Sequence, residues 1–327
     1  MERAVNPALL EVARLTTGFP AGSRTLVAVN DVTFTVQAGE TLGLVGESGS
    51  GKSVTAFSIM RLVQPPGRVL DGSVRFRGRE LLALTEREMC AVRGAEIALI
   101  FQEPMTALTP VFTIGDQVAE TLVVHQRAGW KQARREAVEL LEAVRIPEPA
   151  RRARDYPHQL SGGQRQRVMI AMALACRPAL VIADEPTTAL DVTTQAQVLE
   201  LLRTMKQRYG LSLLLITHDL GVIAEMADRV AVMYAGRIVE QAPVRELFQR
   251  PRHPYTQGLL ASLPWRNGMR LQAIEGTMPS PLDPPPGCAF EPRCGQRRPH
   301  CSRAVPALRP VGPAHEVRCV LYEEADA

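Results

Sequence analysis

The sequence predicts an α/β fold, in which helices cover a mostly parallel sheet, followed by a small irregular extension rich in proline and cysteine. Three observations lead to this prediction. Short apolar runs alternate with helical patterns over the first 240 of the 327 residues. A glycine-rich loop joins a strand pattern to a helix pattern at residues 46–53. Residues 241–327 hold 14 of the 25 prolines and four of the six cysteines, and dense proline disfavours long helices and central strands.

The strand patterns are short and apolar. Residues 32–36 alternate apolar and polar side chains, as a half-buried strand does, and residues 41–45 form a short buried run. Further continuous apolar runs, which fit strands buried on both faces of a parallel sheet, occur at residues 97–101, 179–183 and 213–216. Helices between such strands form right-handed crossovers.

Two helices carry recognisable start signals. Thr85 and Glu88 have the spacing of a capping box for a short helix that ends near Gly94. Ser161 suits the N-cap of a helix over residues 165–175.

Composition is that of an ordinary globular protein, with 46% hydrophobic and 22% charged residues. The longest uninterrupted apolar stretch, residues 168–176, has nine residues, whereas a membrane-spanning helix needs about 20. Residues 1–10 hold no apolar segment long enough for a secretion signal. We therefore expect a chain that stays in the cytosol, and a net charge of +4 is too mild to indicate a nucleic-acid partner.

Residues 46–53 read Gly-Glu-Ser-Gly-Ser-Gly-Lys-Ser and match G-x-x-x-x-G-K-[ST] in full, between the strand at 41–45 and a helix pattern at 52–62. Glycines let backbone N–H groups close around phosphate oxygens, and the helix N-terminus adds a favourable dipole. Lys52 would reach the β- and γ-phosphates as a compact charge. Only three of the 38 basic residues are lysines, so composition does not account for it. A glycine-rich turn that binds nothing is the alternative, and motif and context together disfavour it.

An acidic pair, Asp184-Glu185, follows the apolar run at 179–183. The carboxyl end of a buried parallel strand lies at the ligand edge of the sheet. Asp184 would hold Mg²⁺ together with the Ser53 hydroxyl, and Glu185 is then the natural base for an attacking water. Taken alone, such an acidic pair is more simply interpreted as the polar end of a strand. A complete phosphate loop upstream favours the catalytic interpretation.

Residues 160–164 read Leu-Ser-Gly-Gly-Gln, which offers a second anion site of bare backbone at a helix start, although in isolation it is a simple glycine–serine turn. The order of phosphate loop, pentapeptide, acidic pair and His218 after an apolar strand resembles that of ATP-binding-cassette (ABC) ATPases over nearly the whole chain. The resemblance implies a P-loop (RecA-like) core with an antiparallel β subdomain and an α-helical subdomain. We expect this nucleotide-binding domain to span residues 1–245, with the extension at residues 246–327.

The resemblance also implies roles for single residues. Phe19 would stack on adenine, and Gln102 would touch the Mg²⁺ shell, complete its ligands with Ser53 and Asp184, and sense a membrane subunit. His218 would contact the γ-phosphate and position Glu185 and water. The residues assigned to ATP in and beside the phosphate loop are Gly46, Glu47, Ser48, Gly49, Ser50, Gly51, Lys52, Ser53 and Val54.

A dimer is implied as well, because the chain holds one phosphate loop and one pentapeptide. In the family that it resembles, each ATP lies between the loop of one subunit and the pentapeptide of the other. Asp191 would communicate across this interface. The residues expected to act on the partner's ATP are Ser161, Gly162, Gly163, Gln164 and Asp191.

Further segments are similar to the oligopeptide/dipeptide/nickel importer class: Phe-Gln-Glu-Pro-Met-Thr at 101–106 with Pro110, and Arg-His-Pro-Tyr-Thr at 252–256. Residues 51–55 and 58–61 look like the first, D-type, of the two ATPases of these importers. The resemblance implies a second homologous ATPase as heterodimer partner, two transmembrane permease subunits and an extracytoplasmic substrate-binding protein. The chain would lie at the cytoplasmic face of the cell membrane as a peripheral subunit.

Peptides are the expected cargo, with nickel or another small solute as the alternative. In this class the ATPase subunit does not contact the transported solute, so its sequence does not specify the cargo. Two residues depart from the pattern of this class: Ala107 and Thr109 stand where serine and asparagine are expected, beside Gln102, in the region that would face the membrane subunit. One alternative function is that of a soluble ABC ATPase in DNA repair or translation. Such proteins usually carry two cassettes or a long insertion, and this sequence shows neither. A P-loop kinase or GTPase would not need residues 160–164.

The extension carries four cysteines separated by five, six and seventeen residues: Cys288, Cys294, Cys301 and Cys319. A cytosolic location disfavours disulfides, and four thiolates in a core-poor stretch suit a metal or an iron–sulfur cluster. Zn²⁺ fits the ligand count equally well, and four unliganded thiols are the simplest alternative. Residues 287–294 and 315–319 resemble segments of some members of the importer class, which favours a [4Fe–4S] cluster. We expect its role to be structural, since nothing in the sequence places it near the ATP residues.

Overall fold

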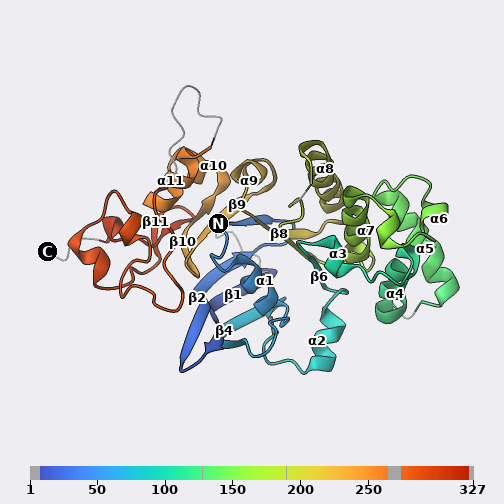
Figure 1. The fold of residues 1–327 in the computed structure, drawn as a ribbon, viewed down its shortest axis with the longest axis horizontal. Coiled ribbons are helices and arrows are strands. Elements are labelled where there is room, and N and C mark those ends of the chain that lie inside the picture. The colour runs from blue at the N-terminus through green and yellow to red at the C-terminus, as the bar shows by residue number, and fades with distance from the viewer. Residues whose placement is uncertain (1–7, 127, 189, 264–273, 324–327) are drawn as a thin grey trace, which may run out of the picture. The chain divides into compact units, whose positions relative to one another are not determined.

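The computed structural model describes residues 8–126, 128–188, 190–263 and 274–323. The chain divides into two compact units. The first contains residues 1–37, 41–82 and 217–327, and the second contains residues 38–40 and 83–216. Both combine strands with helices, which confirms the α/β prediction (Figure 1).

An antiparallel sheet forms one half of the first unit, with the order β2-β1-β4-β5. Its strands are β1 (Leu10–Ala21), β2 (Arg24–Val36), β4 (Arg68–Phe76) and β5 (Arg79–Glu80). In β2, Val32, Phe34 and Val36 are buried and the residues between them are not, so the predicted alternation at 32–36 is confirmed. One face of this sheet therefore packs into the core.

The other half of the first unit is built around β3 (Thr41–Val45), whose five residues are all buried. It pairs in parallel with β9 (Arg229–Tyr234), which continues through antiparallel pairs into β10 (Arg237–Pro243), β12 (His315–Val317) and β11 (Arg309–Gly312). The extension thus adds two short strands to this sheet. The helices of the unit are α1 (Lys52–Ile59), α9 (Leu220–Met226), α10 (Val244–Gln249) and α11 (Pro254–Ala261).

The first helix is shorter than predicted. The pattern at 52–62 indicated a helix through Leu62, but α1 ends at Ile59 and Met60 is its C-cap. Arg61 adopts a left-handed backbone with φ of 51°, which a continuing helix cannot contain.

The second unit contains three parallel strands, β6 (Ile97–Ile100), β7 (Leu180–Asp184) and β8 (Ser212–Thr217, whose last residue falls in the first unit), in the order β6-β7-β8. All three lie within two residues of the predicted runs. The helices are α2 (Glu86–Val92), α3 (Pro104–Ala107), α4 (Ile114–Gln126), α5 (Trp130–Ala143), α6 (Pro149–Arg152), α7 (Gly162–Leu174) and α8 (Val192–Tyr209).

Helix caps in this unit follow the sequence signals. Thr85 accepts a hydrogen bond from the Glu88 N–H at 3.3 Å, and the Glu88 carboxylate accepts from the Thr85 N–H at 2.7 Å. This reciprocal pair is the predicted capping box, and it satisfies backbone donors that the first turn leaves unpaired.

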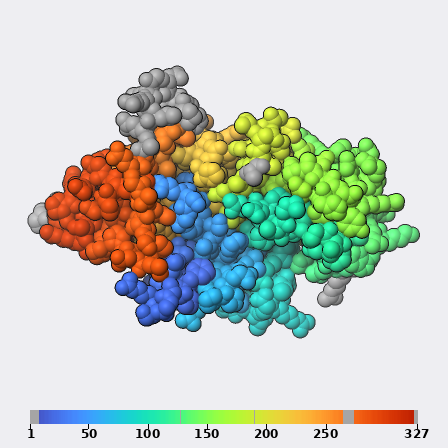
Figure 2. Space-filling view, viewed as in Figure 1, coloured from blue at the N-terminus to red at the C-terminus, as the bar shows by residue number. Residues whose placement is uncertain are grey.

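The extension packs onto β9 through a cluster of aromatic side chains. Phe290 is 3% exposed and packs edge-on against Tyr234 of β9, with ring centroids 5.3 Å apart. Tyr255 of α11 completes the cluster, 4.6 Å from Tyr234 and 5.4 Å from Phe290. In Figure 2 the orange and red residues of the extension form one surface with blue N-terminal residues of the same unit.

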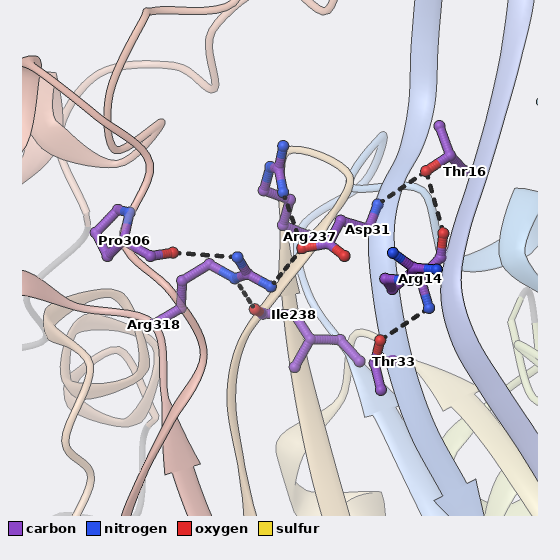
Figure 3. A network of polar contacts seen from close by, with 8 residues as sticks. All are labelled: Arg14, Thr16, Asp31, Thr33, Arg237, Ile238, Pro306 and Arg318. Carbon is purple, nitrogen blue, oxygen red and sulfur yellow. Dashed lines mark hydrogen bonds and ion pairs between the residues drawn. The ribbon is translucent and has the colours of Figure 1, made fainter. Parts of the chain in front are cut away.

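A polar network ties the last residues of the extension to the antiparallel sheet (Figure 3). Arg318 donates to the Asp31 carboxylate at 3.1 Å, to the Ile238 carbonyl at 3.1 Å and to the Pro306 carbonyl at 3.1 Å. Arg237, the first residue of β10, also donates to Asp31, at 3.4 Å. One carboxylate of β2 therefore joins the extension to the β9–β10 hairpin.

Across the described ranges, no helix has both the length and the apolar character that crossing a bilayer requires.

Replacing Phe290 by alanine should loosen the extension, because removing a buried ring typically costs about 3–5 kcal/mol. We expect a lower thermal midpoint and faster proteolysis within residues 280–323. Leu282→Ala is the matched control, since Leu282 is 43% exposed in the same extension. Equal protease resistance of the Phe290 variant and the control would show that the aromatic cluster does not hold the extension.

Candidate functional site

The phosphate loop lies between β3 and α1, as predicted, in a space that excludes side chains. A Cβ on Gly46 would lie 2.2 Å from the Met233 carbonyl oxygen, and one on Gly51 would lie 2.4 Å from that of Ala28. Gly51 also has a φ of 104°, a conformation that a side chain disfavours. The glycines of the motif are therefore required by close backbone packing within the first unit.

Lys52 curls back over the loop. Its Nζ donates to the carbonyl oxygens of Gly46 at 2.9 Å and Glu47 at 3.0 Å, and only 5% of the residue is exposed. The Ser50 carbonyl accepts from the Gly236 N–H at 2.9 Å, which ties the loop to the β9–β10 turn. The Ser50 hydroxyl itself is buried, and no described residue hydrogen-bonds to it.

Glu47 makes contacts that the sequence did not reveal. Its N–H donates to the Tyr255 hydroxyl at 3.0 Å, and its carboxylate pairs with Arg293 of the extension. The extension therefore contacts a residue of the phosphate loop, which nothing in the sequence indicated. Arg293 and Tyr255 lie in the segments 287–294 and 252–256 that resemble the importer class, but neither segment indicates which residue it contacts.

Phe19 lies on β1 and is half-buried. A Cβ on Gly67 would lie 2.3 Å from its ring, so the ring packs closely over that glycine. Its expected stacking on adenine stays a prediction.

In the second unit, Asp184 ends β7 and is 2% exposed, at the carboxyl edge of the parallel strands. Glu185 follows with a left-handed backbone, φ 47°, and its N–H donates to the Ile216 carbonyl at 2.9 Å. Its Oε2 accepts from the Gln102 amide at 3.2 Å and the Thr188 hydroxyl at 2.7 Å. The structure thus brings together Gln102 and Glu185, which the sequence analysis had assigned to one site.

The pentapeptide begins α7. Ser161 is the exposed N-cap, accepting from the Gln164 N–H at 3.3 Å, while the Gln164 side chain accepts from the Ser161 N–H at 3.0 Å. A Cβ on Gly163 would lie 2.5 Å from the Thr194 methyl of α8, whereas one on Gly162 would make an ordinary contact with a Leu190 methyl at 3.8 Å. The predicted N-cap is confirmed, and the helix starts three residues before the predicted range.

Asp191 is the N-cap of α8 and accepts hydrogen bonds from the Thr194 N–H at 2.9 Å and hydroxyl at 2.7 Å. The hydroxyl bond lowers the pKa of Asp191. Since Thr194 also touches Gly163, the starts of α7 and α8 lie side by side. Ala189, two residues earlier, lies outside the described residues.

His218 directly follows β8, is exposed, and belongs to the first unit. Its expected approach to the γ-phosphate stays a prediction.

The four cysteines of the extension line one small pocket, and all are free thiols. Burial raises the pKa of Cys288 and of Cys294, and it raises the pKa of Cys319 to about 11. Among the described residues, however, no three histidine, cysteine or acidic side chains are arranged to hold a metal ion. The expected ligand set is therefore gathered in one place without the geometry of a metal centre.

Sequence comparison identifies two regions: residues 29–188 match the ABC transporter family, and residues 239–301 match the oligopeptide/dipeptide transporter C-terminal region. The oligopeptide transport ATP-binding protein AppD of Bacillus subtilis is 52% identical over 322 residues, covering 98% of each chain. The dipeptide transport ATP-binding protein DppD of the same organism is 49% identical, covering 97% of this chain and 95% of that one.

Among solved structures, the dimeric bacterial ABC transporter cassette MJ0796 has a TM-score of 0.65 at 30% identity, covering 72% of this chain and 99% of that one. The same cassette in a post-hydrolysis state with ADP and Pi has a TM-score of 0.65 at 29% identity. With a complete phosphate loop, an acidic pair at a strand end and this likeness along the whole length, the chain belongs to the ABC transporter ATPases and carries the C-terminal region of their oligopeptide/dipeptide group.

Proposed function

We propose that this protein is the ATP-hydrolysing motor subunit of an importer for di- or oligopeptides. The observation that carries the proposal is the full-length likeness to oligopeptide and dipeptide transport ATP-binding proteins, which includes the specific C-terminal region. Residues 1–245 would form the nucleotide-binding domain, and residues 246–327 the extension. The subunit would bind two transmembrane permeases at the cytoplasmic face of the membrane, with a separate substrate-binding protein delivering the peptide.

ATP would bind at the phosphate loop through backbone N–H groups and Lys52. The loop already presents bare backbone at the start of α1, which is where anions bind favourably. Mg²⁺ prefers oxygen ligands, and the Ser53 hydroxyl, the Asp184 carboxylate and the Gln102 amide would supply them. When bound, the ion would neutralise charge that develops on the phosphates.

Glu185 would act as the general base that takes a proton from the attacking water. Hydrogen bonds from Gln102 and Thr188 orient its carboxylate, and its backbone is tied to β8 through Ile216. His218 would hold the γ-phosphate and the water in line. A base fixed in this way needs little reorganisation when water attacks.

The pentapeptide would serve the ATP of a partner ATPase. Ser161 is exposed at the start of α7, where its backbone can face a second subunit. Asp191 starts the adjoining helix and would contact the same partner. A second, similar ATPase is the proposed partner, so that two composite sites form per heterodimer.

The four cysteines would hold a [4Fe–4S] cluster, with Zn²⁺ as the alternative metal. Support comes from the donor set: four thiols line one pocket, and none is in a disulfide. Their raised pKa values describe thiols without metal, and thiolate–metal bonds would require deprotonation on binding.

Glu185→Gln should retain ATP binding and lose most hydrolysis, because a positioned general base contributes about 10²–10⁴-fold. Steady-state phosphate release and nucleotide binding, measured on the same preparation, separate the two effects. Glu139→Gln, on the exposed face of α5, is the control for loss of a carboxylate. Turnover close to wild type in the Glu185 variant would exclude it as the base.

Ser161→Arg should damage the ATP site formed on the partner's phosphate loop, while the isolated subunit still binds ATP. Thr85→Arg, which destroys a comparable capping box on α2, controls for the lost helix cap. Hydrolysis by the assembled pair should fall only with Ser161→Arg. Loss of ATP binding by the isolated Ser161 variant would contradict a site shared between subunits.

Anaerobic purification should give a brown protein with about four irons per chain, the content of a cluster held by four cysteines. Cys294→Ser should lose the iron, whereas Cys90→Ser, at an exposed cysteine of α2, should retain it. A colourless protein with one zinc would reject iron–sulfur and keep the four ligands. If neither the wild-type protein nor the Cys90 variant contains iron or zinc, the four cysteines are free thiols and do not bind a metal.

A further inference from the structure

One ion pair joins the extension to the phosphate loop. The Arg293 guanidinium and the Glu47 carboxylate form two parallel bonds, Nη1 to Oε2 at 2.9 Å and Nη2 to Oε1 at 3.1 Å. The Arg293 side chain is 6% exposed and that of Glu47 is 30% exposed. Bidentate pairs of this kind fix geometry as well as contribute energy, because the planar fork matches the carboxylate.

Glu47 is held on its backbone as well. Its N–H donates to the Tyr255 hydroxyl, which belongs to a fully buried residue of α11. Its carbonyl accepts from Lys52, the residue that would reach the phosphates. The second residue of the loop is therefore fixed on side chain, N–H and carbonyl at once.

Arg293 also donates hydrogen bonds to other groups of the first unit. Its Nε donates to the Glu275 carbonyl at 2.9 Å, its Nη2 to that of Ile274 at 3.3 Å, and its Nη1 to the Tyr234 hydroxyl at 3.3 Å. Burial lowers the pKa of Arg293, but its hydrogen bonds to Glu47 and Tyr234 outweigh this effect and raise the pKa above its usual value. The guanidinium therefore stays charged and cannot rotate freely.

We propose that Arg293 is a positioning residue of the ATP site: through Glu47 it holds the phosphate loop in its anion-binding shape and neutralises a carboxylate beside the phosphates. The inference deepens the proposed function and rests on the loop's role in binding ATP. Without Arg293, the Glu47 side chain would be free to move and its charge would repel the phosphate groups. The extension thus sets how tightly the subunit binds nucleotide.

The test measures ATP affinity, and KM against kcat, in the full-length chain. Arg293→Met should raise the Kd for ATP about tenfold, equivalent to about 1.4 kcal/mol, with kcat at saturating ATP within about twofold. Hydrogen exchange at the amides of residues 46–51 should accelerate. Arg318→Met is the matched control, because it removes an equally buried arginine of the extension that contacts Asp31 rather than the loop.

Two further variants show whether the pair acts as a unit. Glu47→Gln with Arg293→Met should bind ATP no more weakly than Arg293→Met alone, because the uncompensated charge is gone. Arg293→Lys keeps the charge but loses the fork, so it should fall between wild type and Arg293→Met. If Arg293→Met fails to fold, the ATP affinity of Arg293→Lys tests the positioning role instead.

Equal losses of affinity in the Arg293 and Arg318 variants would overturn the proposal, since they would indicate general loosening of the extension. A double variant that binds ATP more weakly than Arg293→Met alone would overturn it too. Lys52→Ala separates this failure from that of the proposed function. If Lys52→Ala abolishes ATP binding and Arg293→Met leaves it unchanged, only the positioning role fails, whereas unchanged binding with Lys52→Ala means that the loop is not the ATP site.

Discussion

Close backbone packing around the phosphate loop is the constraint on which the rest of the first unit depends. The loop leaves a fully buried strand, β3, and passes within contact of the carbonyls of Met233 and Ala28, so Gly46 and Gly51 cannot carry side chains there. The same packing fixes the start of α1 and directs Lys52 back over the loop. A binding site made of backbone can keep its shape only if the surrounding strands are themselves rigid.

The extension contacts the rest of the first unit through two arginines, each of which directly precedes a cysteine, and only the first of them reaches the loop. Arg293, before Cys294, pairs with Glu47 of the loop, and Arg318, before Cys319, pairs with Asp31 of β2. Whatever orders the cysteines therefore also orders two contacts to the nucleotide-binding part of the first unit. This arrangement gives a physical reason for a loop-rich extension on a compact ATPase.

The second unit carries Glu185, the expected base, and the residues expected to face the partner subunit, whereas His218 lies in the first unit. Glu185 adopts a left-handed backbone, which costs energy for a residue with a side chain and is retained where neighbours enforce it. Here the neighbours are Ile216, Gln102 and Thr188, which all bond to the same residue. Gln102 would thus link the base to the segment expected to face a membrane subunit.

The sequence by itself determined the features that are encoded locally. The strand at 41–45, the capping box at Thr85, the N-cap at Ser161 and the phosphate motif each depend on residues within a few positions of one another, and each lies where it was predicted. The end of α1 was missed by three residues, because the backbone turn at Arg61 has no marker such as glycine or proline.

Only the tertiary structure decided which distant residues serve the loop. Arg293 and Glu47 are 246 residues apart, and no local pattern around either residue indicates that the two pair. The hydrogen bond between Glu47 and Tyr255 and the pairing of β12 with β10 likewise could not be predicted, since both depend on the path by which the chain returns. A long-range ion pair is specified by where two segments meet, and that meeting is a property of the packed fold.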